Sequence, residues 1–197
     1  MKKTSFLCIL VLMFIGISSC TNEENNLDQN EVDSSIKTRA VYTFPTVSQI
    51  LASTVVQNAM EAAWRQMISN ASASGRSEYG FYIYYNHNNG SYYVGNTVAG
   101  PVNSGCAGTN SSISLGRVTS NIDVCAFFHC HTTLQYCPST DSRRTGPSSS
   151  DTSFANNNNL PGIVYDYSSS TIYGGHNSND NYTSYTFGPS QRPDMYY

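Results

Sequence analysis

The chain has 197 residues and a formal net charge of -3 at pH 7, which indicates one compact domain or one domain with a tail. Only 12% of its residues are charged, whereas Tyr, Asn, Ser, Gly and Thr are abundant. Electrostatic capture of nucleic acid needs clustered Lys and Arg, so this composition predicts that nucleic acid is not a partner.

Residues 1–19 are typical of an export signal, because two lysines precede an apolar run over residues 6–17. That run is shorter than the ~20 apolar residues of a membrane-spanning helix. The sequence ISSC at residues 17–20 resembles the lipobox of bacterial lipoproteins, which implies cleavage before Cys20 and lipidation of that residue. An ordinary signal peptide followed by an unrelated cysteine is the alternative.

Residues 20–42 are polar and acidic and have no apolar period, so we expect the lipidated Cys20 to be followed by a flexible tether. The acidic start TNEEN is similar to the export tag of surface lipoproteins in Bacteroidetes-type bacteria. This resemblance implies a protein held by its lipid at the outer membrane of the cell envelope, with exposure at the cell surface as one of two topologies. The domain itself is expected at residues 43–197.

Four cysteines remain in this domain: Cys106, Cys125, Cys130 and Cys137. An even number of cysteines in an exported domain favours disulfides over free thiols, and three pairings are open. The chain has no two CxxC pairs, which argues against a structural zinc site built from cysteines.

Helical spacing of apolar residues predicts a helix over residues 46–70, capped by Thr46 or Ser48. The residues expected on its core-facing side are Ile50, Leu51, Val55, Met60, Trp64, Met67 and Ile68. Residues 78–94 read YGFYIYY, then turn residues with Asn89 and Gly90, then YYV, which predicts a β-hairpin. A further strand is expected at residues 113–118.

Residues 121–131 form an apolar run with the length and composition of a buried strand. After a long loop, Ser148 is placed to cap a short helix over residues 148–156, with Asp151 three positions later. Strands are expected at residues 160–167, 171–173 and, at a sheet edge, 182–187. The elements together predict an α/β domain with a single mixed β-sheet flanked by helices.

Two histidines end the buried run. Residues two apart on a strand point to the same face, so His129 and His131 would project together, with Cα atoms about 6.6 Å apart. Cys130 would point to the other face and is a poor ligand for the same ion. Catalytic zinc usually has three protein ligands, and Asp141 and Asp151 are the candidates for the third. Their pattern with a strand-opening glutamate raises the question of a hydrolytic site.

Glu78, the pair His129 and His131, and Ser148 with Asp151 resemble the JAMM signature of the JAB/MPN family, which is a glutamate, then His-x-His, then Ser-x-x-Asp. The segments SEYGFYIYY, FFHCH, GPSSSD and PGIVYDY are similar to the corresponding parts of the family, and the resemblance covers about residues 46–175. It implies the JAB/MPN architecture, which is cytidine-deaminase-like.

The resemblance implies a role for each residue. His129, His131 and Asp151 would bind Zn2+. Glu78 would take a proton from the water that the zinc activates and pass it to the leaving amine. Ser148 would donate a hydrogen bond to the developing oxyanion. The reaction would be hydrolysis of a peptide or isopeptide bond.

One departure concerns the spacing, because sixteen residues, 132–147, separate His131 from Ser148, whereas the family has a shorter gap. We interpret these residues as an insertion that contains Cys137, and we prefer Asp151 to Asp141 as the third ligand.

The sequence therefore predicts a lipid-anchored envelope zinc metallopeptidase of JAMM type. Its partners would be the membrane and a peptide-like substrate, either a protein or a peptidoglycan cross-link. The alternative is a non-catalytic surface lipoprotein that uses the same fold as a binding module. Elsewhere in the chain, His87 and His176 are expected in solvent, and Asp123 and Asp166 are expected as edge-facing charges.

Overall fold

The computed structural model describes residues 41–72, 75–104, 111–118, 123–132, 145–168 and 181–196. All of them belong to one compact unit, Thr38–Tyr197. The predicted signal peptide, Cys20 and nearly all of the predicted tether lie outside the described residues. Within the described ranges, no helix is both long and apolar enough to cross a membrane.

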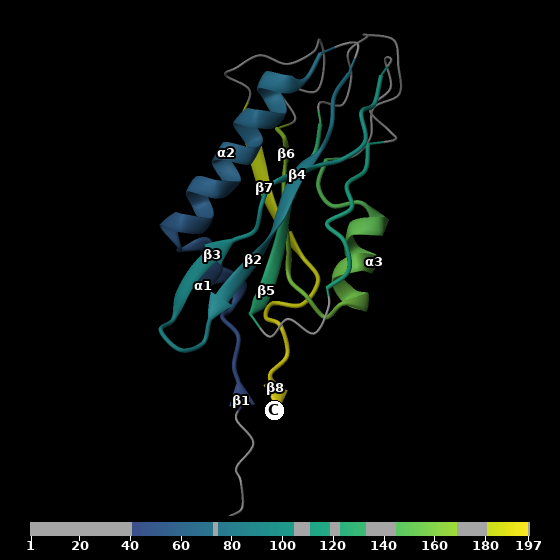
Figure 1. Cartoon of the computed structure of the whole chain (residues 1–197). Coiled ribbons are helices and arrows are strands. Elements are labelled where there is room, and N and C mark those ends of the chain that lie inside the picture. The colour runs from purple at the N-terminus through teal and green to yellow at the C-terminus, as the bar shows by residue number, and fades with distance from the viewer. Residues whose placement is uncertain are drawn as a thin grey trace, which may run out of the picture. The chain divides into compact units, whose positions relative to one another are not determined.

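A mixed six-stranded sheet forms the centre of the domain (Figure 1). Its main path runs in the order β3 (Ser91–Val94), β2 (Tyr79–Asn86), β5 (Val124–Cys130), β6 (Gly162–Tyr167) and β7 (Tyr182–Phe187), and β4 (Val98–Ala99) pairs with the start of β2. Strands β5 and β6 are parallel, and the other pairs are antiparallel. The predicted α/β class with a mixed sheet is confirmed. A separate two-stranded sheet of β1 (Val41–Tyr42) and β8 (Met195–Tyr196) was not predicted.

Helices cover both faces of the main sheet (Figure 1). Helix α2 (Thr54–Asn70) packs its buried side chains with those of β2, β5 and β6 in the larger apolar cluster. Helix α3 (Ser149–Asn157) lies on the opposite face and contributes Ala155 to a second cluster with Val124, Phe127 and Leu160. The buried strand β5 thus has an apolar layer on each side, which agrees with its continuous apolar sequence.

The predicted helix at residues 46–70 is two helices. Helix α1 (Val47–Leu51) begins at a capping box formed by Thr46 and Gln49, so the prediction of Thr46 as a cap is confirmed. The backbone is extended at Ser53, which is the N-cap residue of α2, so α2 begins as a separate helix. This break changes the helical phase, which is why Val55 is 50% exposed and Val56 is buried. The prediction of Val55 in the core was therefore wrong.

Other predicted elements have different outcomes. The hairpin of β2 and β3 is confirmed, and Gly90 adopts the positive φ of 71° that its turn requires. The strand predicted at residues 113–118 is wrong, since residues 111–118 form no strand. They are held by side chains instead, including the Tyr82 hydroxyl, which donates to the Gly116 carbonyl at 2.7 Å. The strand predicted at 171–173 lies outside the described residues.

The register between β2 and β5 places the histidine strand against the start of β2. Gly80 lies opposite His129, and Tyr79 lies opposite Cys130. A Cβ atom on Gly80 would come within 2.4 Å of the Phe128 carbonyl oxygen, so this position requires glycine. The close approach brings the residues that precede β2 beside the end of β5.

The cysteines of β5 correct one prediction. Cys125 and Cys130 are both buried free thiols, so the predicted disulfides do not include them. Cys130 points towards α2, as expected, and its Sγ contacts the carbonyl oxygens of Tyr79 at 3.4 Å and Ala63 at 3.8 Å. Each thiol belongs to the larger apolar cluster, so packing accounts for a cysteine at each position without a disulfide partner. Cys106 and Cys137 lie outside the described residues.

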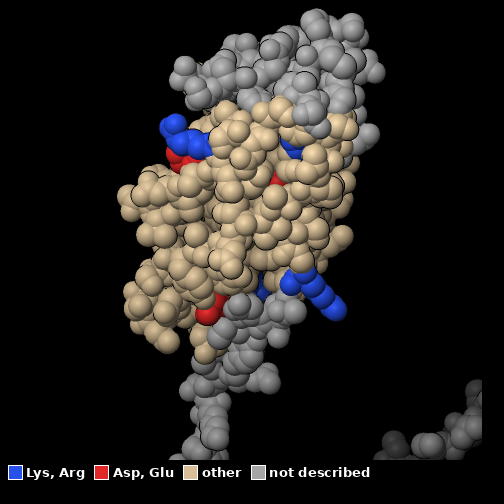
Figure 2. Space-filling model, turned by 45° about the horizontal axis from the view of Figure 1, so that its top comes forward, with Lys and Arg blue, Asp and Glu red and all other residues tan. Residues whose placement is uncertain are grey.

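Charged side chains are sparse on the face of the domain seen in Figure 2. On the described part of that face, Lys, Arg, Asp and Glu occur singly or as close opposite pairs, and no large patch of one sign is visible. On α2, Arg65 Nη2 and Glu61 Oε1 lie 2.7 Å apart, from residues one helical turn apart. This surface agrees with the low charge of the sequence.

Candidate metal centre

Two histidines converge at the end of β5. His129 is the penultimate residue of the strand, and His131 follows it directly. Their Nε2 atoms lie 3.1 Å apart, and the residues are only 1% and 5% exposed. The predicted convergence of the two rings on one face of the strand is confirmed. Two buried imidazole nitrogens at this separation are arranged as ligands of one ion would be.

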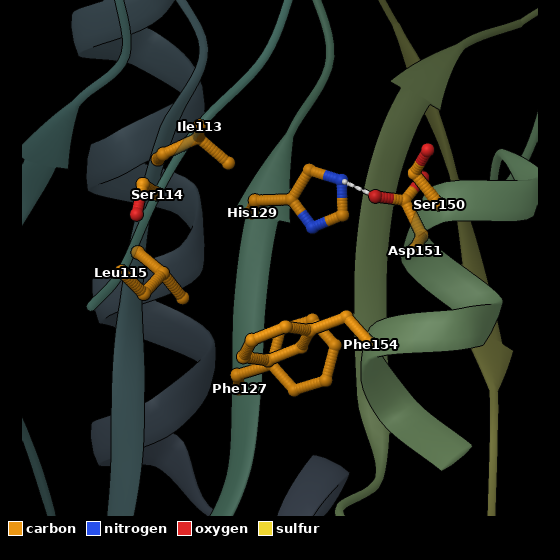
Figure 3. A pocket seen from close by; sticks show the side chains of 8 residues that line it. All are labelled: Ile113, Ser114, Leu115, Phe127, His129, Ser150, Asp151 and Phe154. Carbon is orange, nitrogen blue, oxygen red and sulfur yellow. Dashed lines mark ion pairs between the residues drawn. The ribbon is translucent and has the colours of Figure 1, made fainter. Parts of the chain in front are cut away.

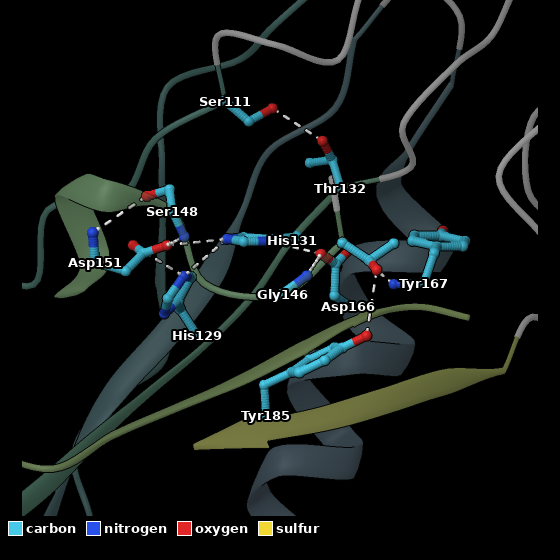
Figure 4. A network of polar contacts seen from close by, with 11 residues as sticks. Ser111, His129, His131, Thr132, Gly146, Ser148, Asp151, Asp166, Tyr167 and Tyr185 are labelled. Carbon is cyan, nitrogen blue, oxygen red and sulfur yellow. Dashed lines mark hydrogen bonds and ion pairs between the residues drawn. The ribbon is translucent and has the colours of Figure 1, made fainter. Parts of the chain in front are cut away.

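The carboxylate of Asp151 faces both rings from α3 (Figure 4). Its Oδ1 lies 3.4 Å from Nε2 of His129, and its Oδ2 lies 3.5 Å from Nε2 of His131. The first turn of α3 fixes this position through a capping box. The Ser148 N–H donates to Asp151 Oδ2 at 2.7 Å, and the Asp151 N–H donates to Ser148 Oγ at 3.1 Å. The cap that starts the helix therefore also aims the carboxylate.

Asp151 remains ionised in this setting. Burial by itself raises the pKa of this carboxyl, but the contacts with His129 and His131 and the hydrogen bonding with Ser148 outweigh burial. The net effect holds the pKa of Asp151 well below its ordinary value. A negative charge is thus present beside the two imidazoles, which favours a cation there.

A second carboxylate approaches from the start of β2. Glu78 immediately precedes β2 and is 6% exposed. One ligand atom from each of Glu78, His129 and His131 lies within 4.8 Å of the others, and all three residues are buried. The close pairing of β2 with β5 at Gly80 brings Glu78 to this place.

The spacing of these groups fits a small divalent cation. With Zn–N distances of about 2.0–2.1 Å, two ligands of a tetrahedral zinc ion are about 3.3 Å apart. The two histidine Nε2 atoms are 3.1 Å apart, and the two oxygens of Asp151 lie 3.4 Å and 3.5 Å from His129 Nε2 and His131 Nε2 respectively. The buried group of Glu78, His129 and His131 could therefore hold a metal ion, with the half-buried Asp151 carboxylate beside the two rings.

Asp166 was not predicted as part of the site. It lies in β6, next to β5, and is fully buried, so its description as an edge-facing charge was wrong. Its Oδ2 lies 3.1 Å from Nδ1 of His131 and accepts the Gly146 N–H at 2.7 Å, while its Oδ1 accepts the Tyr167 N–H at 2.8 Å (Figure 4). A sequence signal existed, because an aspartate inside a buried apolar strand needs a polar partner.

The remaining residues singled out in the sequence lie in different places. Ser148 is at the site, at the exposed N-terminus of α3. Asp141 and His176 lie outside the described residues. His87 is half-buried rather than exposed, because its ring packs against Tyr42, Phe44 and Tyr85. The Asp123 carboxylate accepts a hydrogen bond from a tyrosine hydroxyl at the other end of β5.

A pocket of about 220 Å³ opens beside His129 (Figure 3). His129 and Asp151 form part of its wall, so the pocket and the candidate metal centre share two residues. A molecule bound in the pocket would lie directly beside the histidine and carboxylate cluster.

Comparisons with known proteins add no relative. The chain matches no protein-family model, no curated protein and no solved structure.

Proposed function

We propose that this chain is a zinc metallohydrolase of the JAMM type, with JAB/MPN-like architecture, that cleaves a peptide or isopeptide bond. One observation carries the proposal. Two buried histidine Nε2 atoms lie 3.1 Å apart, with Asp151 at 3.4 and 3.5 Å and Glu78 in the same cluster. Two imidazoles with two carboxylates are the donors that hydrolytic zinc sites use.

The residues of the site divide into metal ligands and a general acid–base residue. His129, His131 and Asp151 would hold the ion, which leaves Glu78 for acid–base chemistry. When bound, zinc lowers the pKa of a coordinated water to about 7 and polarises a carbonyl. Glu78 would take the proton of the attacking water and return it to the leaving amine. Its burial and its position within 4.8 Å of the histidine ligand atoms support this role.

Ser148 is proposed as the donor to the oxyanion. Its Oγ accepts the Asp151 N–H, which leaves its own O–H to donate to a substrate. It stands at the exposed N-terminus of α3, where the backbone N–H groups also favour negative charge. The serine would thus position a zinc ligand and stabilise developing charge with one side chain.

The location of the enzyme belongs to the same proposal and rests on residues 1–42. Lipidation of Cys20 would hold the domain at the outer membrane, close to proteins and peptidoglycan cross-links of the envelope. Mass spectrometry of the mature N-terminal peptide tests this part. An acylated Cys20 is the expected result, and an unmodified N-terminus would contradict it.

The first experiment measures metal content. The full chain, purified without added metal, is compared with His129→Ala and Asp151→Ala by elemental analysis, and His87→Ala serves as the matched control. We expect about one zinc per chain in the wild type and the control, and loss of zinc in both site variants. No metal in the wild type, even after zinc is supplied, would contradict the hydrolase and favour a non-catalytic binding module.

A further inference from the structure

The pocket beside His129 has a polar layer and an apolar layer (Figure 3). His129 on β5 and Asp151 on α3 form the polar layer, and Figure 3 shows them facing each other. Phe127, two residues before His129, and Phe154, three residues after Asp151, form the apolar layer. The period of two in a strand and the turn of a helix place each phenylalanine directly below its polar neighbour.

The apolar layer is closely packed. The ring of Phe127 packs edge to face with Phe154, with centroids 5.0 Å apart, and with Phe187, with centroids 5.6 Å apart. Gly162 makes room for this packing, because a Cβ there would lie 2.3 Å from the Phe187 ring and 2.8 Å from the Phe127 ring. Phe127 is itself only 3% exposed, so it forms a fixed floor.

A third wall comes from the extended segment at residues 111–118. Ile113 and Leu115, two residues apart, line the pocket on the side away from α3, with Ser114 between them (Figure 3). Leu115 also packs against the core cluster that contains Phe127. The Tyr82 hydroxyl bonded to the Gly116 carbonyl holds this segment in place.

The size and chemistry of the pocket restrict its ligand. A dry cavity of about 150 Å³ lined by Leu, Ile and Phe binds benzene, so about 220 Å³ has room for a leucine or phenylalanine side chain. It is below the ~300–1,000 Å³ of sites for drug-sized molecules. Among its eight lining residues, only His129 and Asp151 are ionisable, and both belong to the metal centre.

We infer that this pocket is a specificity subsite that receives a leucine- or phenylalanine-sized side chain adjacent to the amide bond to be cleaved. The inference rests on the proposed function and deepens it by naming the substrate class. The shared residues His129 and Asp151 fix the distance, since a side chain on the apolar floor leaves its backbone amide at the metal centre. Substrates with glycine or alanine next to the amide bond to be cleaved would leave the pocket unfilled and bind more weakly.

The test uses two series of probes with the full chain. The first is N-acetyl-glycine, -leucine and -phenylalanine hydroxamate, whose chelating group addresses the zinc-loaded protein, followed by calorimetry. The second is the corresponding N-acetyl amino-acid amides with metal-free protein, followed by ligand-observed NMR. In the first series we expect the leucine and phenylalanine probes to bind at least about tenfold more tightly than the glycine probe, because each buries an apolar side chain.

Two neighbouring serines supply a matched pair of variants. Ser150 lines the pocket and Ser149 does not, and both are exposed in the first turn of α3. Ser150→Phe should fill the pocket and remove the preference for large side chains, whereas Ser149→Phe should keep it. The second series should show contacts from the leucine and phenylalanine side chains that Ser150→Phe abolishes.

The outcomes separate the two proposals. Zinc binding with equal affinity for the three hydroxamates would overturn the subsite and leave the hydrolase standing. Failure to bind zinc would overturn the hydrolase, and the amide series would still test the pocket. Amides with no preference for a large side chain, or a preference that Ser150→Phe does not change, would overturn the subsite.

Discussion

Nδ1 of His131 lies 3.1 Å from Oδ2 of Asp166, and both side chains are buried. The contact links the end of β5 to the neighbouring parallel strand β6. The backbone N–H of His131 also donates to the Tyr165 carbonyl of β6, at 2.9 Å. A histidine that uses Nε2 for a metal commonly has its other nitrogen held by a carboxylate. Asp166 Oδ2 in turn accepts the Gly146 N–H at 2.7 Å, which helps to fix the carboxylate beside His131.

This relationship predicts the effect of Asp166→Asn on metal affinity. The change keeps the size of the side chain and replaces the carboxylate beside His131 Nδ1 with a neutral amide. Loss of such outer contacts typically weakens metal binding by 10–100-fold, so we expect a zinc affinity lower by about that factor. Competition against a chelator of known affinity measures it.

Asp123→Asn is the matched control for that experiment. Asp123 accepts a hydrogen bond from the Tyr93 hydroxyl at 2.9 Å, at the opposite end of β5 from the histidines. Its substitution should leave zinc affinity unchanged within about twofold. Because Asp166 is fully buried, thermal unfolding should confirm that the variant folds. A folded Asp166→Asn with wild-type affinity would show that Asp166 does not orient the ligand.

A second prediction separates Glu78 from the metal ligands. Glu78→Gln keeps the shape of the residue but removes its ability to accept a proton at neutral pH. If Asp151 is the third ligand, we expect Glu78→Gln to retain zinc and to lose hydrolysis by about 10²–10⁴-fold, which is the usual contribution of a general base. Metal content and turnover of a peptide with leucine at the bond measure the two effects.

The contrary outcome is equally specific. Glu78 lies within 4.8 Å of both histidine nitrogens and is therefore also close enough to take part in binding after a small shift. If Glu78→Gln loses zinc while Asp151→Ala keeps it, the roles of the two carboxylates are exchanged. Retained activity in Glu78→Gln would contradict its role as the base.

Local sequence signals predicted the parts of the site that depend on local structure. The cap at Ser148 and the alternation along β5 act within three residues, so spacing indicated that Asp151 would follow the cap in the first turn and that the two histidines would share one face. The choice of Asp151 over Asp141 as a ligand came from the resemblance to the JAMM signature. The coarse fold followed from the same apolar periods. These features need no knowledge of which strands are neighbours.

Features that depend on strand pairing were harder to predict. Asp166 reaches His131 only because β6 lies parallel to β5, and Phe127 becomes a pocket floor only because α3 crosses that face. The strand expected at residues 113–118 failed because apolar alternation favours an extended chain but does not supply a neighbour with free backbone groups. The disulfide prediction failed for Cys125 and Cys130 because cysteine count ignores burial.

Ser148 gives a third prediction, which concerns stability. Its side chain accepts the Asp151 N–H, so Ser148→Ala removes the N-cap of α3 and should lower the free energy of unfolding by about 0.5–2 kcal/mol. Ser149→Ala, one residue further on and outside the cap, should change it by less than about 0.5 kcal/mol. Urea unfolding of the three proteins measures the difference.

The cap and the proposed oxyanion contact can be separated with glycine. Gly is tolerated at an N-cap at a cost of only a few tenths of a kcal/mol, but it has no hydroxyl. Ser148→Gly should therefore be nearly as stable as wild type and yet lose activity by about 10²–10³-fold, as removal of an oxyanion donor does. Full activity in a stable Ser148→Gly would limit the serine to its capping role.

The buried thiols of β5 give a fourth prediction. Burial raises the pKa of Cys125 to about 12, and burial also raises the pKa of Cys130 above its ordinary value. The thiolate is the reactive form, so neither residue should be alkylated by iodoacetamide in the native chain near pH 8. Both should react in concentrated urea, which peptide mass spectrometry can localise. Alkylation of either thiol in the native protein would contradict its burial.

The raised pKa of Cys125 also predicts how stability depends on pH. Folding favours the neutral thiol, so this contribution is complete below pH 9.0, the ordinary pKa, and is lost as pH rises towards about 12. The free energy of unfolding of the wild type should therefore fall above pH 9, and that of Cys125→Ala should fall less steeply. The decline should be reduced but not abolished, because burial also raises the pKa of Tyr82 and Tyr92 to about 12. Urea unfolding at a series of pH values measures both free energies. Equal declines in wild type and Cys125→Ala would show that the titration of Cys125 does not contribute to the pH dependence of stability.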